Sequence, residues 1–292
     1  MRLLSLTKTV IIGVLMAWLV AGCSSIRLVY NNGEQLGWWW IDAYFDFSRE
    51  QTPQVKAGIN RLFAWHRSTQ LVPYAALLHA AQAPVMEQTT AAEVCRWQAR
   101  VRDALQPALE RALQEGSAVV PVLGKAQFDH LQEHFAKGNA DRRDKYLQDD
   151  VDERRDAAVK RALKWAEGLY GNLDRPQKLV VEAGVAASPF DAKAWLAERE
   201  RWQGEALKTL RGLAAEHADP DRVLAALRAL AERAERSTDP VYRAYREQLA
   251  TYNCAFAARI HNATTPAQRQ VARDRLKGWE DDLRNMASKG AS

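Results

Sequence analysis

Five short phrases place a helix-capping residue beside a proline, and they constrain the fold of this chain more than any other feature. They are Asp174-Arg175-Pro176, Ser188-Pro189, Asp219-Pro220, Asp239-Pro240 and Thr265-Pro266. A Ser, Thr or Asp side chain accepts hydrogen bonds from the free N–H groups at a helix start, and proline fits the first turn of a helix. Between the phrases, Ala, Leu, Arg, Glu and Gln dominate, and alternating runs of β-branched residues are absent. The sequence therefore predicts an all-α fold, an elongated multi-helix bundle of about ten helices with no sheet.

Further helices are expected between residue 52 and residue 170. Thr52-Pro53 opens a helix that runs through Thr69, and a shorter helix spans residues 72–83. Another helix runs from near Gly124 to about Lys137. The charged segment 140–170 is expected to form one long helix with an exposed face, and its acidic run 149–153 is interpreted as part of that solvated face.

The most regular of these helices begins at residue 90. Thr90 and Glu93 have the spacing of a capping box, in which each residue satisfies a backbone N–H near the other. The helix that follows carries apolar residues at helical spacing, and its pattern fades near Glu115-Gly116. The apolar positions are Val94, Trp97, Val101, Leu105 and Leu109. This face is expected to be the one that the helix buries.

A second capping pattern recurs four times: a cap-like residue is followed three positions later by glutamine. The four copies are Phe47-Ser48-Arg49-Glu50-Gln51, Leu123-Gly124-Lys125-Ala126-Gln127, Leu173-Asp174-Arg175-Pro176-Gln177 and Thr264-Thr265-Pro266-Ala267-Gln268. The copies are irregularly spaced, so they do not indicate a solenoid. We interpret them as capping boxes in which the glutamine side chain accepts the N–H of the cap residue. The phrase also resembles the Leu-Thr-x-x-Gln motifs of periplasmic helical stress chaperones of the Spy and CpxP kind.

The N-terminus carries the features of an export signal. Arg2 and Lys8 flank the apolar run 10–20, which is shorter than the about 20 residues that span a bilayer. The run ends in Val-Ala-Gly followed by Cys23, which resembles a bacterial lipobox. The resemblance implies that residues 1–22 are removed and that Cys23 is acylated and anchors the chain in a membrane. Because Ser24 is not aspartate, similarity to enterobacterial sorting signals implies the outer membrane, although other bacteria read this position differently and inner-membrane anchoring stays open.

Composition and charge favour a folded, exported body. The expected organisation is a lipidated tether over residues 23–34, an all-helical periplasmic domain over residues 35–288 and a disordered tail over residues 289–292. Hydrophobic residues make up 47% of the chain, which is enough for a core. The net charge of +5 is small and the signs alternate along the chain, so nucleic acid is not expected as a partner.

Three cysteines are present, and two of them remain for a disulfide once Cys23 carries lipid. Cys254 lies roughly opposite the apolar stripe of its own helix, where a cross-link to a second helix fits better than a core thiol. An exported compartment permits such a bond. We therefore expect a Cys95–Cys254 disulfide, which would stabilise the fold by about 4–5 kcal/mol in the chain-entropy model. The alternative is a pair of buried free thiols.

The aromatic stretch from Trp38 to Phe47 admits two interpretations. Its apolar residues surround a helix instead of lining one face, which is typical of a helix buried on several sides. The stretch also lies close to the expected acyl anchor, and tryptophan favours bilayer interfaces. Core packing is the favoured interpretation, and contact with the membrane is the alternative.

One motif points to catalysis. His130-Leu131-Gln132-Glu133-His134 matches the H-x-x-E-H signature of inverzincin metalloproteases, in which two histidines bind zinc and the glutamate activates water. Those proteases have mixed α/β domains, and no third ligand can be nominated here. A nucleophile elbow, a phosphate-binding glycine loop and a Cys-x-x-Cys motif are absent from the sequence. We therefore expect no enzyme activity and no cofactor, and keep a zinc-dependent hydrolase as the alternative.

A broader resemblance joins the two ends of the chain. The lipobox is followed by Tyr30-Asn31-Asn32 and the aromatic stretch, and the chain ends with His261-Asn262 before the last cap and Gly278-Trp279-Glu280. Together these look like an uncharacterised family of Gram-negative helical lipoproteins, a domain of unknown function. The resemblance implies an all-helical body facing the periplasm and supplies no activity. The expected function is therefore non-enzymatic: interaction, assembly or chaperone-like work in the cell envelope, with an envelope protein or a client polypeptide as partner.

Overall fold

A computed structural model describes residues 25–288, and the expected all-α fold is confirmed. Within this range the chain forms twelve α-helices and two short 3-10 turns, and no strand. The helices are α2 (Ser25–Asn31), α3 (Gly33–Phe45), α4 (Thr52–Thr69), α5 (Leu71–Gln82), α6 (Ala91–Ser117), α7 (Lys125–Tyr146), α8 (Val151–Tyr170), α9 (Arg175–Ala186), α10 (Ala192–Ala215), α11 (Pro220–Glu235), α12 (Pro240–Asn262) and α13 (Pro266–Ser288). The turns are η1 (Pro84–Met86) and η2 (Val120–Val122).

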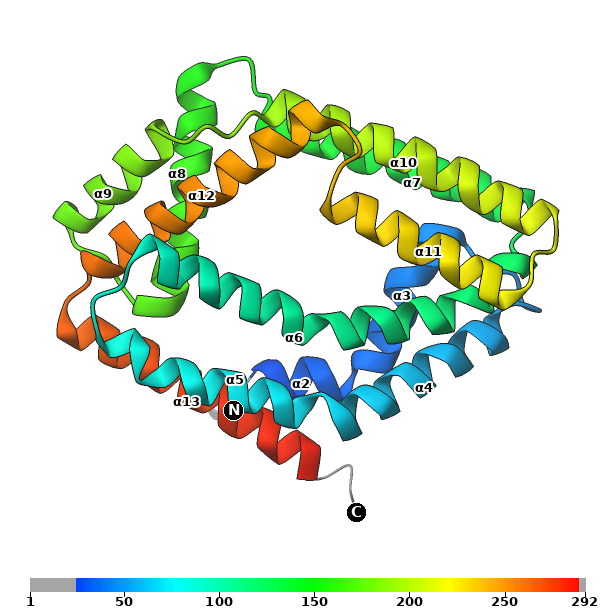
Figure 1. Cartoon of the computed structure of the whole chain (residues 1–292), viewed down its shortest axis with the longest axis horizontal. Helices are drawn as coiled ribbons and strands as arrows, with labels where there is room; N and C mark the ends of the chain where they lie inside the picture. The colour runs from blue at the N-terminus through cyan, green and yellow to red at the C-terminus, as the bar shows by residue number, and fades with distance from the viewer. Residues whose placement is uncertain (1–24, 289–292) are drawn as a thin grey trace, which may run out of the picture.

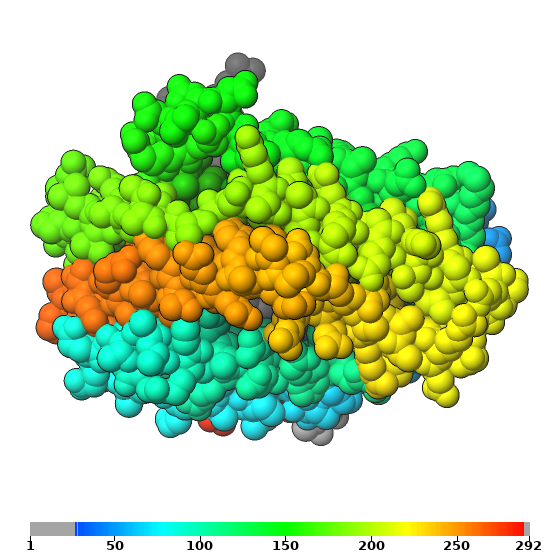
Figure 2. Space-filling model, turned by 45° about the horizontal axis from the view of Figure 1, so that its top comes forward, coloured from blue at the N-terminus to red at the C-terminus, as the bar shows by residue number. Residues whose placement is uncertain are grey.

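The helices are arranged as a flattened frame (Figure 1). Helices α5 and α13 pack side by side along one edge, and α7 and α10 pack along the opposite edge. Helix α6 crosses between these edges and contacts α4 and α11 toward one end of the frame and α12 toward the other. Figure 2 shows α12 lying along α6, with the α8 region standing out from the surface beside α9.

The frame has two hydrophobic cores. The first core joins α3, α4, α7, α10 and α11 with η2, and is built on buried residues that include Phe47, Phe128, Leu131, Leu210 and Val223. The second core joins α8, α9, α12 and α13, and is built on Ala166, Tyr170, Leu173, Val181, Ile260 and Ala272. Long helices thus connect two separate apolar centres.

All four glutamine phrases form the expected capping bonds. The side-chain oxygens of Gln51 and Gln127 accept the N–H groups of Ser48 and Gly124 at 2.9 and 3.0 Å. Those of Gln177 and Gln268 accept the N–H groups of Asp174 and Thr265, both at 2.9 Å. The capping box at Thr90 and Glu93 is also present.

The same glutamines also join the phrases in pairs. Gln51 Nε2 donates to the carbonyl of Val122 at 2.6 Å, and Gln127 Nε2 donates to the carbonyl of Asp46 at 3.2 Å. We call this reciprocal pair the first clasp. Since Phe47 and Leu123 belong to the first core, the clasp holds the starts of α4 and α7 at that core.

A second clasp has the same pattern in the second core. Gln177 Nε2 donates to the carbonyl of Ala263 at 3.0 Å, and Gln268 Nε2 donates to the carbonyl of Asn172 at 2.8 Å. The two glutamine side chains are also hydrogen-bonded to each other, at 2.7 Å from Gln177 Nε2 to Gln268 Oε1. In both clasps the accepting carbonyl lies two residues before the partner's cap residue, so each core is organised around one pair of phrases.

Two expected helix boundaries are wrong. The charged segment 140–170 is not one helix, because α7 continues to Tyr146 and α8 begins at Val151. The side chain of Asp150 accepts the N–H groups of Asp152 and Glu153 at 2.7 and 3.2 Å and so starts a new helix. The acidic run therefore caps α8.

The second wrong boundary is at Ser188-Pro189, which does not start a helix. Asp191 caps α10 instead, and its side chain accepts the N–H groups of Lys193 and Ala194 at 2.8 and 3.0 Å. Ser188 Oγ instead accepts the N–H of Phe190 at 3.3 Å within the link, and the carboxylate of Asp191 supplies the cap three residues later.

The expected disulfide between Cys95 and Cys254 is present. It joins α6 to α12 across 159 positions of sequence, with 5.4 Å between the two Cα atoms. Cys254 is buried at this contact. The bond ties the long central helix to a helix of the second core.

The N-terminal part of the described chain packs against the body. The expected signal peptide of residues 1–22, Cys23 and the tail 289–292 lie outside the described residues, whereas residues 25–34 of the expected tether form α2 and the start of α3. Arg27 Nε pairs with Asp282 Oδ1 of α13 at 2.6 Å. None of the helices within residues 25–288 is long and apolar enough to cross a membrane.

The aromatic stretch has two different sides. Trp38 and Tyr44 pack against the first core, to which buried Phe47 belongs. Trp39 and Trp40 are instead 60% and 62% exposed. Core packing therefore accounts for one side of α3 only.

Candidate functional site

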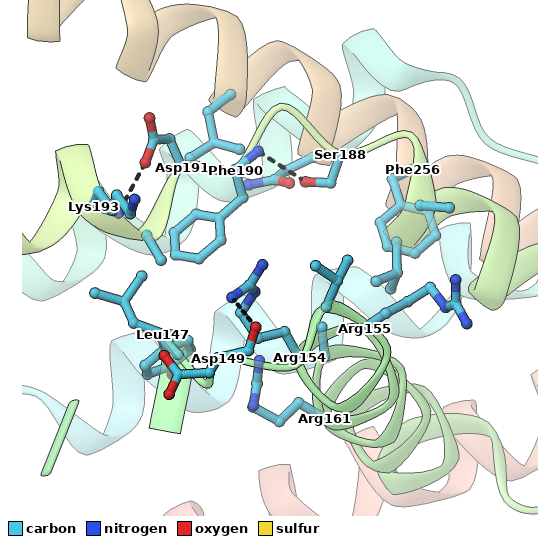
Figure 3. A pocket seen from close by; sticks show the side chains of 18 residues that line it. Leu147, Asp149, Arg154, Arg155, Arg161, Ser188, Phe190, Asp191, Lys193 and Phe256 are labelled. Carbon is cyan, nitrogen blue, oxygen red and sulfur yellow. Dashed lines mark hydrogen bonds between the residues drawn. The ribbon is translucent and has the colours of Figure 1, made fainter. Parts of the chain in front are cut away.

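A groove of about 1050 Å³ lies where the second core meets the α9–α10 link. Its walls come from the α7–α8 link, α8, the end of α9, the start of α10 and one side of α12 (Figure 3). Its apolar lining residues include Val185, Phe190, Leu249 and Phe256. Its charged lining residues are Arg154, Arg155, Arg161, Lys193, Asp149 and Asp191. We call it the basic groove.

A close contact between α9 and α12 positions the apolar floor of the basic groove. A Cβ added to Gly184 would lie 2.0 Å from Cε2 of Phe256, so only glycine allows the ring to pack there. One turn earlier on α12, the hydroxyl of Tyr252 donates to the carbonyl of Gly184 at 2.5 Å. The ring of Phe256 is therefore held against the α9 backbone at one end of the groove.

Three aromatic rings hold the opposite end. Tyr146 lies 6.2 Å from Phe190 and 5.3 Å from Trp195, measured between ring centroids. The backbone N–H of Asp191 donates to the hydroxyl of Tyr245 at 2.8 Å, which ties the α9–α10 link to α12. This link therefore has a defined path, and Phe190 points into the groove (Figure 3).

The α8 wall supplies the positive charge. The guanidinium of Arg154 donates to the carbonyl of Gln148 and so supports the α7–α8 link. Arg155 pairs with Asp152 at 3.0 Å, and the guanidinium of Arg161 lies over the ring of Tyr146 at 4.6 Å. Figure 3 shows Arg154 opposite Phe190, and Arg155 of the same helix extending toward the end of the groove where Phe256 lies.

The charges of the basic groove are unbalanced. Four basic side chains line it against two acidic ones. Arg155 is paired with Asp152 outside the lining, and Asp191 already accepts the N–H groups that start α10, so Arg154, Arg161 and Lys193 carry the surplus. The surplus positive charge lies beside phenylalanine rings and aliphatic side chains. Such a surface suits a ligand that presents apolar groups and negative charges together.

The residues of the H-x-x-E-H motif lie elsewhere, on α7 beside α3. Nε2 of His130 donates to the carbonyl of Ala43 at 3.2 Å, and the ring of His134 lies 4.0 Å from that of Tyr44. Burial lowers the pKa of His134, and the charge of His130 adds to this effect. Glu133 is exposed. Within residues 25–288 no group of three or more His, Cys, Asp and Glu side chains is arranged to hold a metal ion.

The apolar face expected to be buried on α6 is only partly covered. Val101, Leu105 and Leu109 are 45%, 52% and 43% exposed, although their spacing is that of a buried stripe. They occupy the middle of α6, the part to which α11 is joined by ion pairs of Arg102 with Glu235 and of Glu110 with Arg228. The prediction of burial is wrong for these three residues, because α11 meets this part of α6 through charged side chains and leaves the three apolar side chains half exposed.

Sequence reasoning did not identify the basic groove. Its residues come from five separate segments between Tyr146 and Phe256. The one local signal was the acidic run 149–153, which marks the break between α7 and α8. The aromatic residues Phe190 and Trp195 flank a misassigned helix start, and nothing local places them beside Tyr146.

Comparison with known proteins gives a family and no activity. A family model described as a family of unknown function (DUF6279) matches residues 43–243. The match covers the first core, the α8 wall and the α9–α10 link, and ends at the start of α12. No curated protein and no solved structure matches the chain.

Proposed function

We propose that this chain, which belongs to DUF6279, a family of unknown function, is a non-enzymatic cell-envelope protein that binds polypeptide segments in the basic groove. Lipidated Cys23 anchors it in the outer membrane, facing the periplasm. Its work is assembly or chaperone-like: it holds a partner or client chain close to the membrane. The glutamine phrases, which resemble those of Spy and CpxP, support a chaperone-like role.

The observation that carries the proposal is the mixed surface of the basic groove. Phe190, Leu249 and Phe256 offer apolar contacts, while Arg155, Arg161 and Lys193 offer positive charge along the same groove. A polypeptide that alternates apolar and acidic residues satisfies both. The half-exposed stripe of Val101, Leu105 and Leu109 on α6 supports the proposal independently, because unpaired apolar stripes on helices are typical of surfaces that bind partners.

The test is photo-crosslinking from inside the groove in intact cells. A photoreactive residue replaces Asn253, which is exposed and lines the groove. The matched control replaces Thr251, which is exposed on the same helix but does not line the groove. We expect crosslinks to polypeptides from position 253 that are absent from position 251, and we expect the crosslinked peptides to be rich in apolar and acidic residues.

A charge variant makes the test specific to the groove. Arg161→Glu with Lys193→Glu should reduce crosslinking from position 253 by at least tenfold, because both substitutions reverse the charge that faces the ligand. Equal crosslinking from positions 251 and 253, or none from either, would contradict the proposal. Stoichiometric zinc bound through His130 and His134 in the purified protein would instead favour the hydrolase alternative.

The anchor is tested separately. Cys23→Ala should release the protein from the membrane fraction and abolish incorporation of labelled fatty acid. A variant that stays lipidated or membrane-bound would show that the lipobox assignment is wrong. That result would leave the proposal for the basic groove standing.

A further inference from the structure

A second cavity of about 440 Å³ lies beside the first core, between α3, α4, α6, η2, α10 and α11. Its lining is almost entirely aliphatic and aromatic, and includes Ile41, Leu62, Leu113, Val119 and Leu210. Glu115 is the one charged residue among those that line it. We call it the apolar cavity. Its volume falls in the range of about 300–1,000 Å³ that is typical of small-molecule sites.

Three glycines line the apolar cavity. Gly37, Gly58 and Gly116 come from three different helices, and each lies in its wall. A Cβ on Gly116 would meet only Leu227, at 3.7 Å, so a larger side chain at this position can extend without a backbone clash. The space is therefore one that single substitutions can fill.

The charged edge of the cavity holds more positive than negative charge. The carboxylate of Glu115 is bound by Arg61 Nη2 at 2.7 Å and by Arg111 Nη2 at 2.6 Å. Within the described chain, the buried Nε of Arg111 has no hydrogen-bond partner. Two guanidiniums thus share one carboxylate, and one buried donor beside it is unused.

We propose that the apolar cavity binds a single fatty acyl chain, with its anionic head group at Arg61 and Arg111. An acyl chain fits because it brings no polar group into an apolar space. A peptide would bring backbone N–H and C=O groups that the cavity wall cannot satisfy, and unpaired buried polar groups are costly. The surplus guanidinium charge then pairs with the carboxylate or phosphate at the end of the chain.

The entrance is consistent with a ligand of membrane origin. Trp40 lines the cavity and is also 62% exposed, so it lies at the rim, beside exposed Trp39. Tryptophan side chains favour the interface between lipid and water. Both residues belong to α3, at the N-terminal end of the described chain.

Binding of straight-chain fatty acids to the full-length protein, measured by calorimetry below their aggregation limits, tests the proposal. Decanoate, dodecanoate and tetradecanoate should bind with affinities that rise about tenfold per two carbons until the cavity is full. Gly116→Leu should weaken dodecanoate binding at least tenfold by filling the space. Gly204→Leu, at an exposed helix position with open space around it, should bind as the wild type does.

A second variant covers the case in which Gly116→Leu fails to fold. Ala112 lines the cavity and is exposed, so Ala112→Phe should obstruct the entrance without disturbing the core, with the same loss of binding. Arg61→Gln should weaken dodecanoate but leave neutral dodecanol unchanged. Its control is Arg228→Gln, because Arg228 binds Glu110 of α6, which does not line the cavity, whereas Arg61 binds Glu115, which does.

Two measurements identify the source of the bound acyl chain. One is the identity of the lipids that copurify with the protein, and the other is the lipid that the protein takes up from vesicles of phosphatidylethanolamine and phosphatidylglycerol. Both a free fatty acid and a phospholipid acyl chain support the proposal if Gly116→Leu removes them. No binding of any chain length, or binding that Gly116→Leu and Ala112→Phe leave intact, would overturn it. An acidic, apolar peptide that displaces dodecanoate from the cavity would overturn it as well.

Discussion

Buried His261 links three parts of the second core through its two ring nitrogens. Its Nε2 donates to the carbonyl of Glu87 at 2.6 Å, so in the neutral ring Nδ1 accepts from the hydroxyl of Tyr170 at 2.8 Å. Burial lowers the pKa of His261, and the nearby charge of Arg269 lowers it further, while the bond to Glu87 opposes both effects. Burial also raises the pKa of Tyr170 to about 12. The pair is thus held in its neutral form.

This pair makes stability depend on pH. Because the pKa of His261 is lower in the folded state, the unfolded chain binds more protons as the pH falls below about 6.5. The free energy of unfolding should therefore decrease from pH 7 to pH 5. His261→Gln should reduce this slope and should cost about 1–3 kcal/mol at pH 7 by leaving buried partners unpaired. Urea unfolding at pH 7 and pH 5 measures the free energy of unfolding of both proteins and so gives the slope. Exposed His217→Asn is the control, and an unchanged slope in His261→Gln would refute the assignment.

Gly184 allows a second prediction at the level of one residue. Gly184→Ala places a methyl group where Phe256 packs, so the ring or α9 must shift, at a cost of about 1–3 kcal/mol. The control Gly204→Ala has open space and should stabilise α10 by up to about 1 kcal/mol. Thermal unfolding compares the two variants. If Gly184→Ala leaves the free energy of unfolding unchanged, the contact between α9 and α12 is loose enough to accept a methyl group. Crosslinking from position 253 should then also be unchanged.

At the level of elements, the two clasps decide which helix starts lie together. Gln177 is buried, and its side chain both caps α9 and bonds to Ala263 and Gln268. Gln177→Leu should therefore cost about 1–3 kcal/mol for the groups left unpaired. In a double-mutant cycle, Gln177→Leu and Gln268→Leu should couple by about 0.5–3 kcal/mol.

The matching control pairs one residue from each clasp. Gln177→Leu and Gln127→Leu affect different cores and share no partner, so their effects on urea unfolding should add. Additivity inside the second clasp would mean that the bonds between Gln177 and Gln268 contribute nothing. Coupling between the two clasps would mean that the two cores influence each other through the helices that connect them.

The clasps also show how far sequence alone reaches. The bonds of Gln51 to Ser48 and of Gln177 to Asp174 were predictable, because a capping box is complete within four residues. The bonds to Val122 and Ala263 were not, because a side-chain amide can meet any carbonyl that the fold brings near it. The same limit explains α6: spacing shows that Leu105 belongs to an apolar stripe, but only the arrangement of neighbouring helices shows that the stripe is half exposed.

At the level of the whole molecule, α6 connects the two hydrophobic cores. Without it, only the helices along the edges of the frame would connect them. Near its C-terminal end, Glu110 binds Arg228 of α11 at 3.0 Å. Near its start, Cys95 is bonded to Cys254 of α12. A loop of 159 residues closed by this bond is long enough for the chain-entropy model to assign it a stabilisation of about 4–5 kcal/mol. The disulfide lies where α6 packs against α12. The ion pair with α11 holds a different part of α6.

Replacing both cysteines by alanine should therefore lower the free energy of unfolding by about 2–5 kcal/mol in urea. Hydrogen exchange should increase most in the first half of α6 and in the facing part of α12, because these segments lose their cross-link while the pair between Glu110 and Arg228 still holds the far end of α6. Reduction of the wild-type protein should reproduce both effects. Mass spectrometry of non-reduced peptides provides the control for the bond itself. Unchanged stability with the bond demonstrably present would show that the contacts of α5 with α13 and of α4 with α6 hold the two cores together without it.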